Sequence, residues 1–225
     1  MYDELLTYDM GPGVEAVFTR RDSILPFKVV TGHQVHEDKI AVITSADVTR
    51  DELPGCDAYV TSLPGCAIGV RTADCVPVLL YDPVSRVVAA VHAGWKGTVK
   101  RIPQKTVTTL ITRFKTRPEN LLAVIGPSIS ADSFQVGEEV VEFFKRQEFP
   151  MDDIWTFRGP VTGRPMEGGH HIDLWEANRW LLEQSGVRPE KIRVVGIDSF
   201  TTPDFFSARR EGVTCGRMIS AICLL

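Results

Sequence analysis

Short runs of apolar, mostly β-branched residues dominate the first half of the chain and predict strands. Each run has the length of a strand and is bounded by glycine, proline or polar residues, a pattern that favours strands over helices. The predicted strands cover residues 16–19, 40–44, 58–61, 67–70, 76–81 and 87–91. Pro77 lacks the N–H group that a strand ladder needs, so we expect its strand to lie at a sheet edge or to begin at that point.

Helical periodicity appears in the second half of the chain. Apolar residues spaced i, i+3, i+4 and i+7 predict a helix over residues 107–114, and a second helix is predicted around residues 140–144. A third runs from Asp173, a good N-cap residue, to Gly186, a plausible C′ glycine. Strands alternate with these helices at residues 121–125, 192–197 and 218–224. This order favours a mixed α/β or α+β fold over a strict Rossmann pattern.

The composition, and the absence of repeats and linkers, indicate one ordinary globular domain. The 225 residues are 44% hydrophobic and 24% charged, and no repeat or Ser/Gly linker divides them, so we expect a single domain over residues 1–225. A net charge of −4 disfavours a nucleic-acid partner, which normally needs a basic face. The chain contains neither G-x-G-x-x-G nor a P-loop signature, so no dinucleotide or nucleoside triphosphate site is predicted.

The N-terminus and the cysteines bear on location. The first residues lack a basic segment followed by an apolar one, and no apolar run reaches the ~20 residues of a membrane span. The five cysteines include no C-x-x-C pair, which indicates neither a disulfide framework nor a zinc ribbon. We therefore expect a cytoplasmic protein with free thiols and no membrane partner.

Cys75 and His92 lie at neighbouring ends of two successive predicted strands. A third candidate ligand comes from His33-Gln34-Val35-His36. Positions three apart in an extended segment face opposite sides, so one of these two histidines is expected to be a ligand, and spacing does not choose between them. One cysteine and two histidines suit Zn²⁺ or a copper ion, and three protein ligands leave a fourth position open for water or substrate.

Residues around this candidate site offer further chemistry. Asp74 adjoins Cys75, and the glycine-rich turn after His92 brings Trp95 as a stacking surface and Lys96 as a cation that can hold an anion. A second cluster contains Phe206 and an arginine pair, followed by Gly216 and Arg217. Such arginines either form a solvated face or present a guanidinium fork to phosphate or carboxylate.

Four segments together are specific enough to indicate a family. They are Gln34-Val35-His36, residues 72–79 (TADCVPVL), residues 92–97 (HAGWKG), and residues 205–210 (FFSARR) with Gly216-Arg217. In combination they resemble the YfiH-like family of bacterial laccase-domain proteins, also described as polyphenol oxidases and as purine nucleoside phosphorylases. The resemblance covers nearly the whole chain.

The resemblance implies a fold, a metal site and an activity. It implies one domain of β-sheet layers covered by helices, similar to the fold of bacterial toxin deamidases. It assigns the metal to His36, Cys75 and His92, and so selects His36 over His33. The implied activity is phosphorolysis of adenosine, inosine, guanosine and S-methyl-5′-thioadenosine, together with deamination of adenosine.

Departures from the family pattern favour zinc over copper. Where relatives often carry a cysteine pair, this chain has Asp132-Ser133, and where many carry Cys-Thr, it has Asp198-Ser199. Copper prefers soft thiolate ligands, and five histidines are few for a multi-copper site. A polyphenol oxidase is therefore a less favoured alternative to a zinc enzyme.

The implied chemistry assigns roles to the remaining candidates. Zinc lowers the pKa of bound water towards ~7 and makes hydroxide available to attack C6 of adenine. Asp74 is then a proton carrier, or it only orients a ligand. The catalytic candidates are Cys75, His92 and Asp74. The candidates for phosphate are Arg71, Lys96 and Arg210, and those for stacking on the purine are Trp95 and Phe206.

Two other classes of function stay open. Cys75 and His92 can act as nucleophile and base of a thiol hydrolase or deamidase without metal, in which case His36 is dispensable. Alternatively, the zinc is structural and the surface binds a protein, in which case the fourth coordination position is closed. The sequence identifies no particular protein partner.

Overall fold

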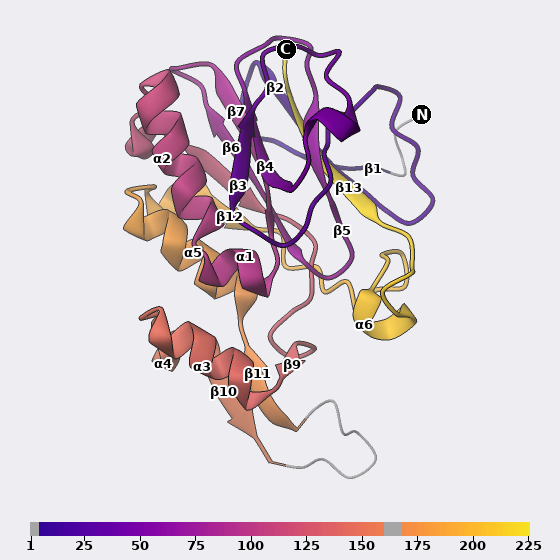
Figure 1. Ribbon diagram of the computed structural model, residues 1–225, viewed down its shortest axis with the longest axis vertical. Coiled ribbons are helices and arrows are strands. Elements are labelled where there is room, and N and C mark those ends of the chain that lie inside the picture. The colour runs from indigo at the N-terminus through magenta and orange to yellow at the C-terminus, as the bar shows by residue number, and fades with distance from the viewer. Residues whose placement is uncertain (1–4, 160–167) are drawn as a thin grey trace.

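The computed structural model describes residues 5–159 and 168–225, which form a layered structure with three sheets (Figure 1). The largest sheet has the strand order β12-β8-β6-β7-β4-β3. Its strands are β3 (Lys39–Val42), β4 (Cys56–Thr61), β6 (Val76–Asp82), β7 (Val87–Ala93), β8 (Leu122–Ile125) and β12 (Ile192–Val194). Two of its pairs, β3 with β4 and β8 with β12, are parallel, and the others are antiparallel. The predicted mixed α/β fold is thereby confirmed.

Two smaller sheets accompany it. The second has the order β1-β2-β13-β5 and consists of β1 (Leu5–Tyr8), β2 (Val14–Thr19), β13 (Met218–Leu224) and β5 (Ile68–Thr72). The third has the order β10-β11-β9 and consists of β9 (Gln135–Val136), β10 (Trp155–Arg158) and β11 (Gly169–Ile172). Figure 1 shows this third sheet at the lower end of the molecule, apart from the other two.

The helices connect and cover the sheets. They are α1 (Trp95–Val99), α2 (Ile102–Phe114), α3 (Glu138–Arg146), α4 (Met151–Ile154), α5 (Leu174–Gln184) and α6 (Ala208–Glu211). In the described parts of the chain, every helix is too short or too polar to traverse a lipid bilayer.

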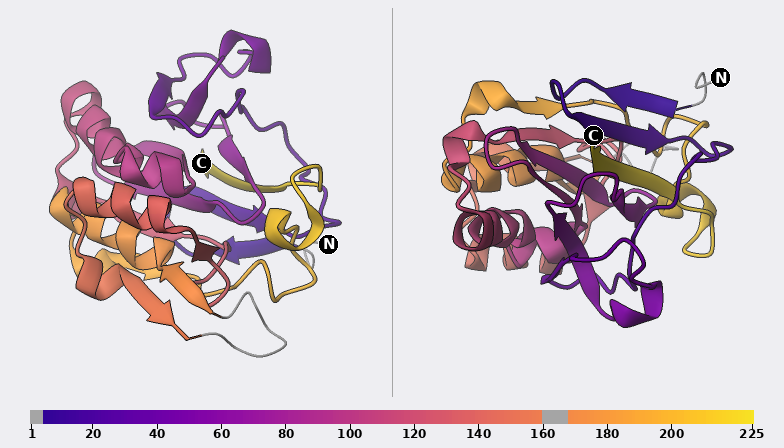
Figure 2. Two further views of the ribbon diagram at one scale, coloured as in Figure 1. Left: turned by 60° about the horizontal axis from the view of Figure 1, so that its bottom comes forward. Right: turned by 90° about the horizontal axis from the view of Figure 1, so that it is seen from above.

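The largest sheet is the middle of three layers (Figure 2). Side chains alternate across its strands, so Val78 and Val91 join the core that contains Leu110 of α2 and Leu181 of α5. Leu79 and its neighbours on the opposite face join a second core with the residues of β2, β5 and β13. Helices thus cover one face and the second sheet covers the other, as the resemblance implies.

The antiparallel pair β6 and β7 forms the centre of this fold, and every residue in both strands is buried. Pro77 is therefore in an interior strand, and its predicted placement at a sheet edge is wrong. The alternative is confirmed, because β6 begins at Val76 and Pro77 is only its second residue. The Pro77 carbonyl accepts a hydrogen bond from Gly126 N, so the residue still contributes to the sheet.

The ends of α5 confirm two further expectations. The Asp173 carboxylate accepts the Glu176 N–H and caps the first turn, while Gly186 follows the helix with a φ of +89°. Other elements were not predicted, among them β1, α1, the third sheet and α6. These elements are short or largely half-exposed, so apolar periodicity gives little signal for them.

Candidate metal centre and pocket

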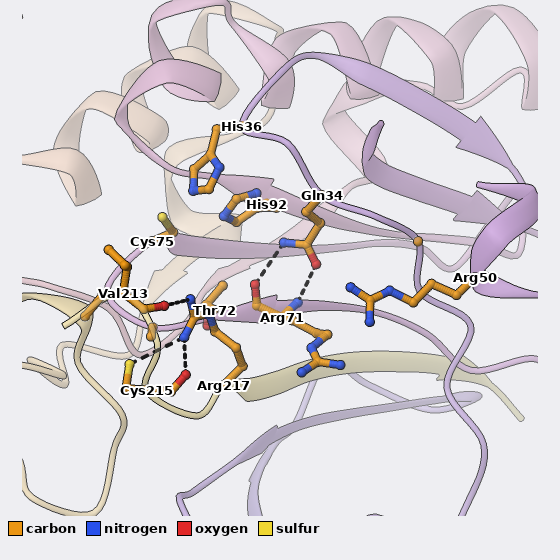
Figure 3. A pocket seen from close by; sticks show the side chains of 13 residues that line it. Gln34, His36, Arg50, Arg71, Thr72, Cys75, His92, Val213, Cys215 and Arg217 are labelled. Atoms are coloured by element: carbon orange, nitrogen blue, oxygen red, sulfur yellow. Dashed lines mark hydrogen bonds between the residues drawn. The ribbon is translucent and has the colours of Figure 1, made fainter. Parts of the chain in front are cut away.

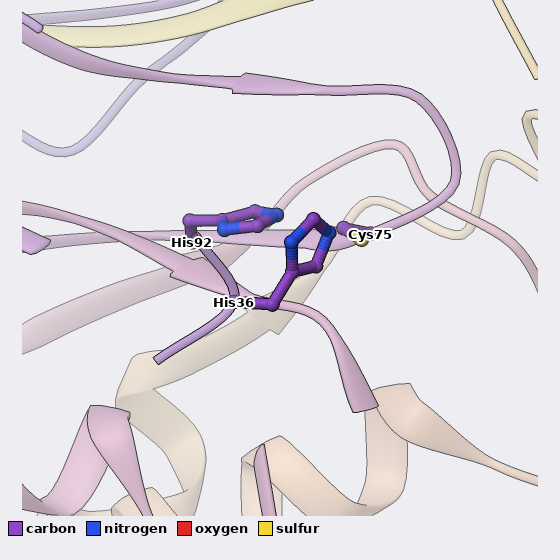
Figure 4. A group of neighbouring side chains, drawn as sticks. All are labelled: His36, Cys75 and His92. Atoms are coloured by element: carbon purple, nitrogen blue, oxygen red, sulfur yellow. The ribbon is translucent and has the colours of Figure 1, made fainter. Parts of the chain in front are cut away.

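His36, Cys75 and His92 come together at one end of the largest sheet (Figure 4). His92 lies near the end of β7, and Cys75 immediately precedes β6, whose Pro77 pairs with His92. His36 comes from the loop that precedes β3. One ligand atom from each side chain lies within 4.8 Å of the others. His33, the other histidine of the H-x-x-H segment, instead places Nε2 2.9 Å from Asp51 Oδ1.

Asp57, a fully buried residue of β4, binds two of these three residues, His36 through its backbone and His92 through its ring. Its Oδ1 accepts hydrogen bonds from His36 N at 3.0 Å and His92 Nδ1 at 2.7 Å. Its Oδ2 accepts hydrogen bonds from Val35 N at 3.1 Å and Glu37 N at 3.0 Å. Because Nδ1 of His92 donates to a carboxylate, the other ring nitrogen is left to bind a metal, as in many histidine metal sites.

Two residues at this site have a left-handed backbone conformation: His36, with φ 62°, and Asp74, which precedes Cys75, with φ 79°. This conformation costs a non-glycine residue about 1–3 kcal/mol and persists where surrounding contacts impose it. For His36 these contacts come from Asp57. Such strain often accompanies functional sites, and here it shapes the loop that presents the His36 ring to Cys75.

Asp74 accepts hydrogen bonds from residues that lie much later in the sequence. Its carboxylate accepts hydrogen bonds from Ser199 Oγ at 2.7 Å, Ser207 Oγ at 3.0 Å and Arg209 N at 2.7 Å. It does not belong to the lining of the pocket described below. These contacts favour the orienting role for Asp74 over the role of proton carrier, because all three donors fix the backbone beside Cys75 and the start of α6.

Electrostatics in the metal-free cluster favour a charged Cys75–His92 pair. Burial opposes ionisation of Cys75, but the charge of His92 and hydrogen bonds from His36 and His92 outweigh it and lower the pKa of the thiol. Burial likewise opposes protonation of His92, yet the Cys75 charge and hydrogen bonds to Asp57 and Cys75 raise its pKa. The thiolate that a metal ligand requires is therefore available at neutral pH.

The absence of a side chain at Gly94 allows Cys75 to lie close to the two histidines. A Cβ atom at this position would lie 2.8 Å from Cys75 Sγ and 3.4 Å from His36 Cδ2. The first distance is too short for a real contact, and the sulfur is not at the end of a long flexible side chain. A side chain at position 94 would therefore push Cys75 away from the two histidines.

Replacing Gly94 by alanine is accordingly expected to weaken metal binding by about tenfold or more, the effect typical of disturbed ligand orientation. A competitive chelator titration measures this affinity. Gly159→Ala is the matched control, because a Cβ there meets nothing within 4 Å. Equal metal affinities of the two variants would contradict the close approach inferred for Gly94.

The three side chains line a pocket with a volume of about 480 Å³ (Figure 3). This size suits a small-molecule ligand. The other lining residues are Gly32, Gln34, Arg50, Arg71, Thr72, Ala73, Ala208, Val213, Cys215 and Arg217. The lining thus combines a metal-competent cluster with three arginines and contains no carboxylate.

Of the five predicted substrate-binding residues, only Arg71 lines this pocket. Trp95 packs against Phe143, with ring centroids 5.8 Å apart, and Lys96 Nζ lies 5.6 Å from the Trp95 ring. Both side chains belong to the start of α1, which leads away from the cluster after Gly94. The structure thus gives no support to their predicted contacts with base and phosphate.

Phe206 and Arg210 also lie outside the lining. The Phe206 ring occupies the space beside Gly216, and the guanidinium of Arg21 lies 4.3 Å from its centroid. The Arg210 guanidinium donates to the carbonyl oxygens of Ser199, Phe200 and Phe205, and to Glu211. Both terminal nitrogens of Arg210 thus bind groups of the protein itself, and the structure gives no support to its predicted role as a phosphate holder.

The sequence reasoning missed four residues that shape this site. Asp57 could have been suspected, because a carboxylate inside an apolar run needs buried partners. Gln34 and Arg217 belonged to recognised segments but received no role. Arg50 gave no signal, since it comes from a short 3-10 turn, Arg50–Glu52, whose place beside the pocket is set by tertiary structure.

Comparisons with known proteins agree with this picture. The profile of a family described as multi-copper polyphenol oxidoreductase laccase matches residues 13–225. A purine nucleoside phosphorylase of Bacteroides thetaiotaomicron is 41% identical, over 90% of this chain and 75% of its own length. Adenosine deaminase RL5, from an unknown prokaryote, is 40% identical over 98% of this chain and 80% of its own length. The crystal structure of the Bacillus licheniformis hypothetical protein YfiH superposes with a TM-score of 0.86 and 27% identity, covering 100% and 98% of the two chains.

Proposed function

Because the chain belongs to the multi-copper polyphenol oxidoreductase laccase family, with a purine nucleoside phosphorylase and an adenosine deaminase among its relatives, we propose that it is a metal-dependent purine nucleoside enzyme. The proposed reactions are phosphorolysis of adenosine, inosine, guanosine and S-methyl-5′-thioadenosine, and deamination of adenosine to inosine. The observation that carries the proposal is the position of the His36–Cys75–His92 cluster in the wall of a pocket of suitable size.

The residues present fit a zinc ion. Zinc binds nitrogen and sulfur ligands at about 2.0–2.3 Å, so ligand atoms within 4.8 Å of one another can share one ion after small side-chain adjustments. The lowered pKa of Cys75 supplies a thiolate, and Asp57 fixes the orientation of His92. Three protein ligands beside a pocket match a catalytic site better than a closed structural one, which argues against a purely structural zinc.

The positions that depart from the family pattern support one zinc over several copper ions. Ser133 Oγ donates to Asp198 Oδ2 at 2.6 Å, so two of the residues that replace cysteines bind each other. They add no soft ligand for a second ion. Oxidation of polyphenols by copper, the activity in the family name, is therefore the less favoured function for this protein.

The protein's own residues then have defined tasks. When bound, the metal supplies Lewis acidity that activates water or polarises the substrate. His36, Cys75 and His92 hold it. Asp57 accepts the hydrogen bond from His92 Nδ1 and so keeps the ring proton on that nitrogen. In phosphorolysis, a phosphate oxygen forms a bond to ribose C1′ while the C1′–N9 bond breaks and the purine takes up a proton. Arg71 supplies positive charge in the same pocket.

The direct test is the metal content of the purified protein, measured beside turnover of adenosine with and without phosphate. We expect about one zinc per chain, adenine and ribose 1-phosphate only when phosphate is present, and inosine in both cases. A fully zinc-loaded protein that converts none of the proposed nucleosides would overturn the proposal.

The charged Cys75–His92 pair favours one second candidate, a thiol hydrolase or deamidase that works without metal. Chelation of the metal distinguishes the two candidates by its effect on turnover. Removal of metal abolishes turnover by the zinc enzyme, whereas the thiol enzyme is unaffected or becomes faster because Cys75 is released.

The lowered pKa of Cys75 predicts the pH dependence of its alkylation. A group with a lowered pKa keeps its thiolate form as the pH falls, until the pH passes below that pKa. From pH 8 to pH 7, alkylation of metal-free protein by iodoacetamide at Cys75 should therefore change little, whereas an ordinary thiol of pKa about 8.5 slows several-fold. Mass spectrometry of the Cys75 peptide measures the rate, and saturating zinc should suppress it. The Cys223 peptide is the control, since burial raises its pKa.

A further inference from the structure

Three arginine side chains share the pocket with the metal-competent cluster. Figure 3 shows Arg71 below Gln34 and Arg50 to its right, whereas Arg217 lies below Cys75, beside Val213 and Cys215. Partial burial and the charges of Arg50 and Arg217 lower the pKa of Arg71, so the three guanidinium groups interact repulsively. No aspartate or glutamate lines the pocket to compensate them.

The three groups differ in how they are held. The Arg217 guanidinium donates to the carbonyl oxygens of Val213 at 2.8 Å and Gly216 at 2.9 Å, and contacts Cys215 Sγ at 3.4 Å. These contacts fix its position without neutralising its charge. Within the described parts of the chain, the Arg50 and Arg71 guanidinium groups show no hydrogen-bond or ion-pair partner. Their donors are therefore free to bind a ligand in the pocket.

Gln34 connects this arginine group to the metal-competent cluster. Its Oε1 accepts the Arg71 N–H at 2.8 Å, and its Nε2 donates to the Arg71 carbonyl at 2.8 Å. The Gln34 amide thus makes the two hydrogen bonds to the Arg71 backbone that a strand beside β5 would make. Because Gln34 is two residues before His36 in the same loop, this two-point contact sets the position of Arg71 relative to the cluster.

We propose that Arg50, Arg71 and Arg217 form an oxyanion subsite that binds inorganic phosphate independently of the metal, with Gln34 setting its position relative to His36. Guanidinium groups bind the oxygens of a phosphate dianion through charge-assisted, often paired hydrogen bonds, and a ligand of opposite charge relieves their mutual repulsion. The choice of phosphate rests on the proposed function, whereas the subsite itself rests on the arginine geometry.

The subsite separates the two proposed reactions. Phosphorolysis consumes phosphate, and deamination does not. Loss of one arginine should therefore raise the KM for phosphate by a larger factor than it lowers the rate of adenosine deamination. Loss of a metal ligand, in contrast, should abolish both reactions.

Calorimetric titration with inorganic phosphate tests the subsite on chelated and on zinc-loaded protein. We expect similar Kd values in the two forms, raised about tenfold or more in each of Arg50→Gln, Arg71→Gln and Arg217→Gln, as for loss of a charge-assisted hydrogen bond. Arg193→Gln is the matched control, since Arg193 is exposed on β12 away from the pocket. Unchanged phosphate binding in all three variants, or binding only in the zinc-loaded form, would overturn the subsite. Because this titration needs no turnover, it gives a result even if the proposed function fails.

Gln34→Glu tests the positioning role. The variant keeps the size of the side chain but replaces the N–H that donates to the Arg71 carbonyl by an oxygen. We expect a higher KM for phosphate with zinc stoichiometry unchanged, because Asp57 still holds the His36 loop. Deamination and phosphorolysis reduced equally, together with lost zinc, would show a merely structural role for Gln34.

Discussion

Replacing Cys75 by alanine is expected to reduce the metal content from about one ion per chain to background and to abolish both nucleoside reactions. Cys75 provides the only negatively charged ligand of the cluster, and two histidines that remain without it bind zinc weakly. Metal catalysis contributes several kcal/mol of transition-state stabilisation, which corresponds to at least about 10³-fold in rate. Metal analysis by mass spectrometry and chromatography of adenosine turnover measure the two effects on the same sample.

Cys223→Ala is the control for this experiment, because it removes a thiol from β13 outside the pocket. It should retain both the metal and the activity, and circular dichroism should show that both variants are folded. A Cys75→Ala protein that keeps its metal yet loses turnover would favour the thiol nucleophile. Undiminished turnover in this variant would exclude both candidate functions that involve Cys75.

The core of the fold was predictable because its elements are long or buried on both faces. The runs at residues 76–81 and 87–91 correspond to β6 and β7, which carry side chains of both cores. The third sheet was missed because its strands mix polar and apolar residues, as in Trp155–Arg158, which is half-exposed. Pro77 was ambiguous for a physical reason: the missing N–H is tolerated equally at an edge and at the first residues of an interior strand.

The candidate site was predictable where a short segment carries it. Cys75 and His92 are adjacent because consecutive antiparallel strands bring one end of β6 to the other end of β7, which is a local consequence of the sequence. The choice of His36 over His33 needed the family resemblance. In the structure the difference follows from Asp57, which turns the His36 backbone, whereas His33 points to Asp51.

Apart from Arg71, the arginines that line the pocket were not predictable, because identical residue types have different partners in three dimensions. Arg210 and Arg217 lie seven residues apart in one segment, and both guanidinium groups bind backbone carbonyls. Arg210 also pairs with Glu211 and lies outside the pocket, whereas Arg217 lines it. Arg50 reaches the same pocket from a distant turn. Charge compensation of this kind depends on tertiary contacts, which a single sequence does not reveal.

Replacing Asp57 by asparagine is expected to weaken zinc binding by about 10- to 100-fold, the usual effect of removing the partner of a ligating histidine. Although burial alone would raise it, hydrogen bonds from His92, Glu37 and Val35 lower the pKa of Asp57, so the native group is a carboxylate. The asparagine NH₂ cannot accept a hydrogen bond. Depending on its orientation, the variant loses its contacts to Val35 N and Glu37 N, or those to His36 N and His92 Nδ1.

The same substitution should lower the free energy of unfolding by about 2–5 kcal/mol, because two buried donors lose their acceptor. Thermal unfolding then shifts down by several degrees. Asp82→Asn is the matched control: Asp82 is also fully buried, but it lies at the opposite end of β6, where Oδ1 accepts the Val84 and Ser85 N–H groups. Asp82→Asn keeps an oxygen that accepts both N–H groups, and the oxygen that it replaces has no hydrogen-bond partner in the described residues. Only Asp57→Asn should lose zinc affinity when both variants are measured well below their unfolding temperatures. Equal zinc affinities in the two variants would mean that the His36 loop and the His92 ring keep their places without Asp57, and that the cluster is organised by its ligands alone.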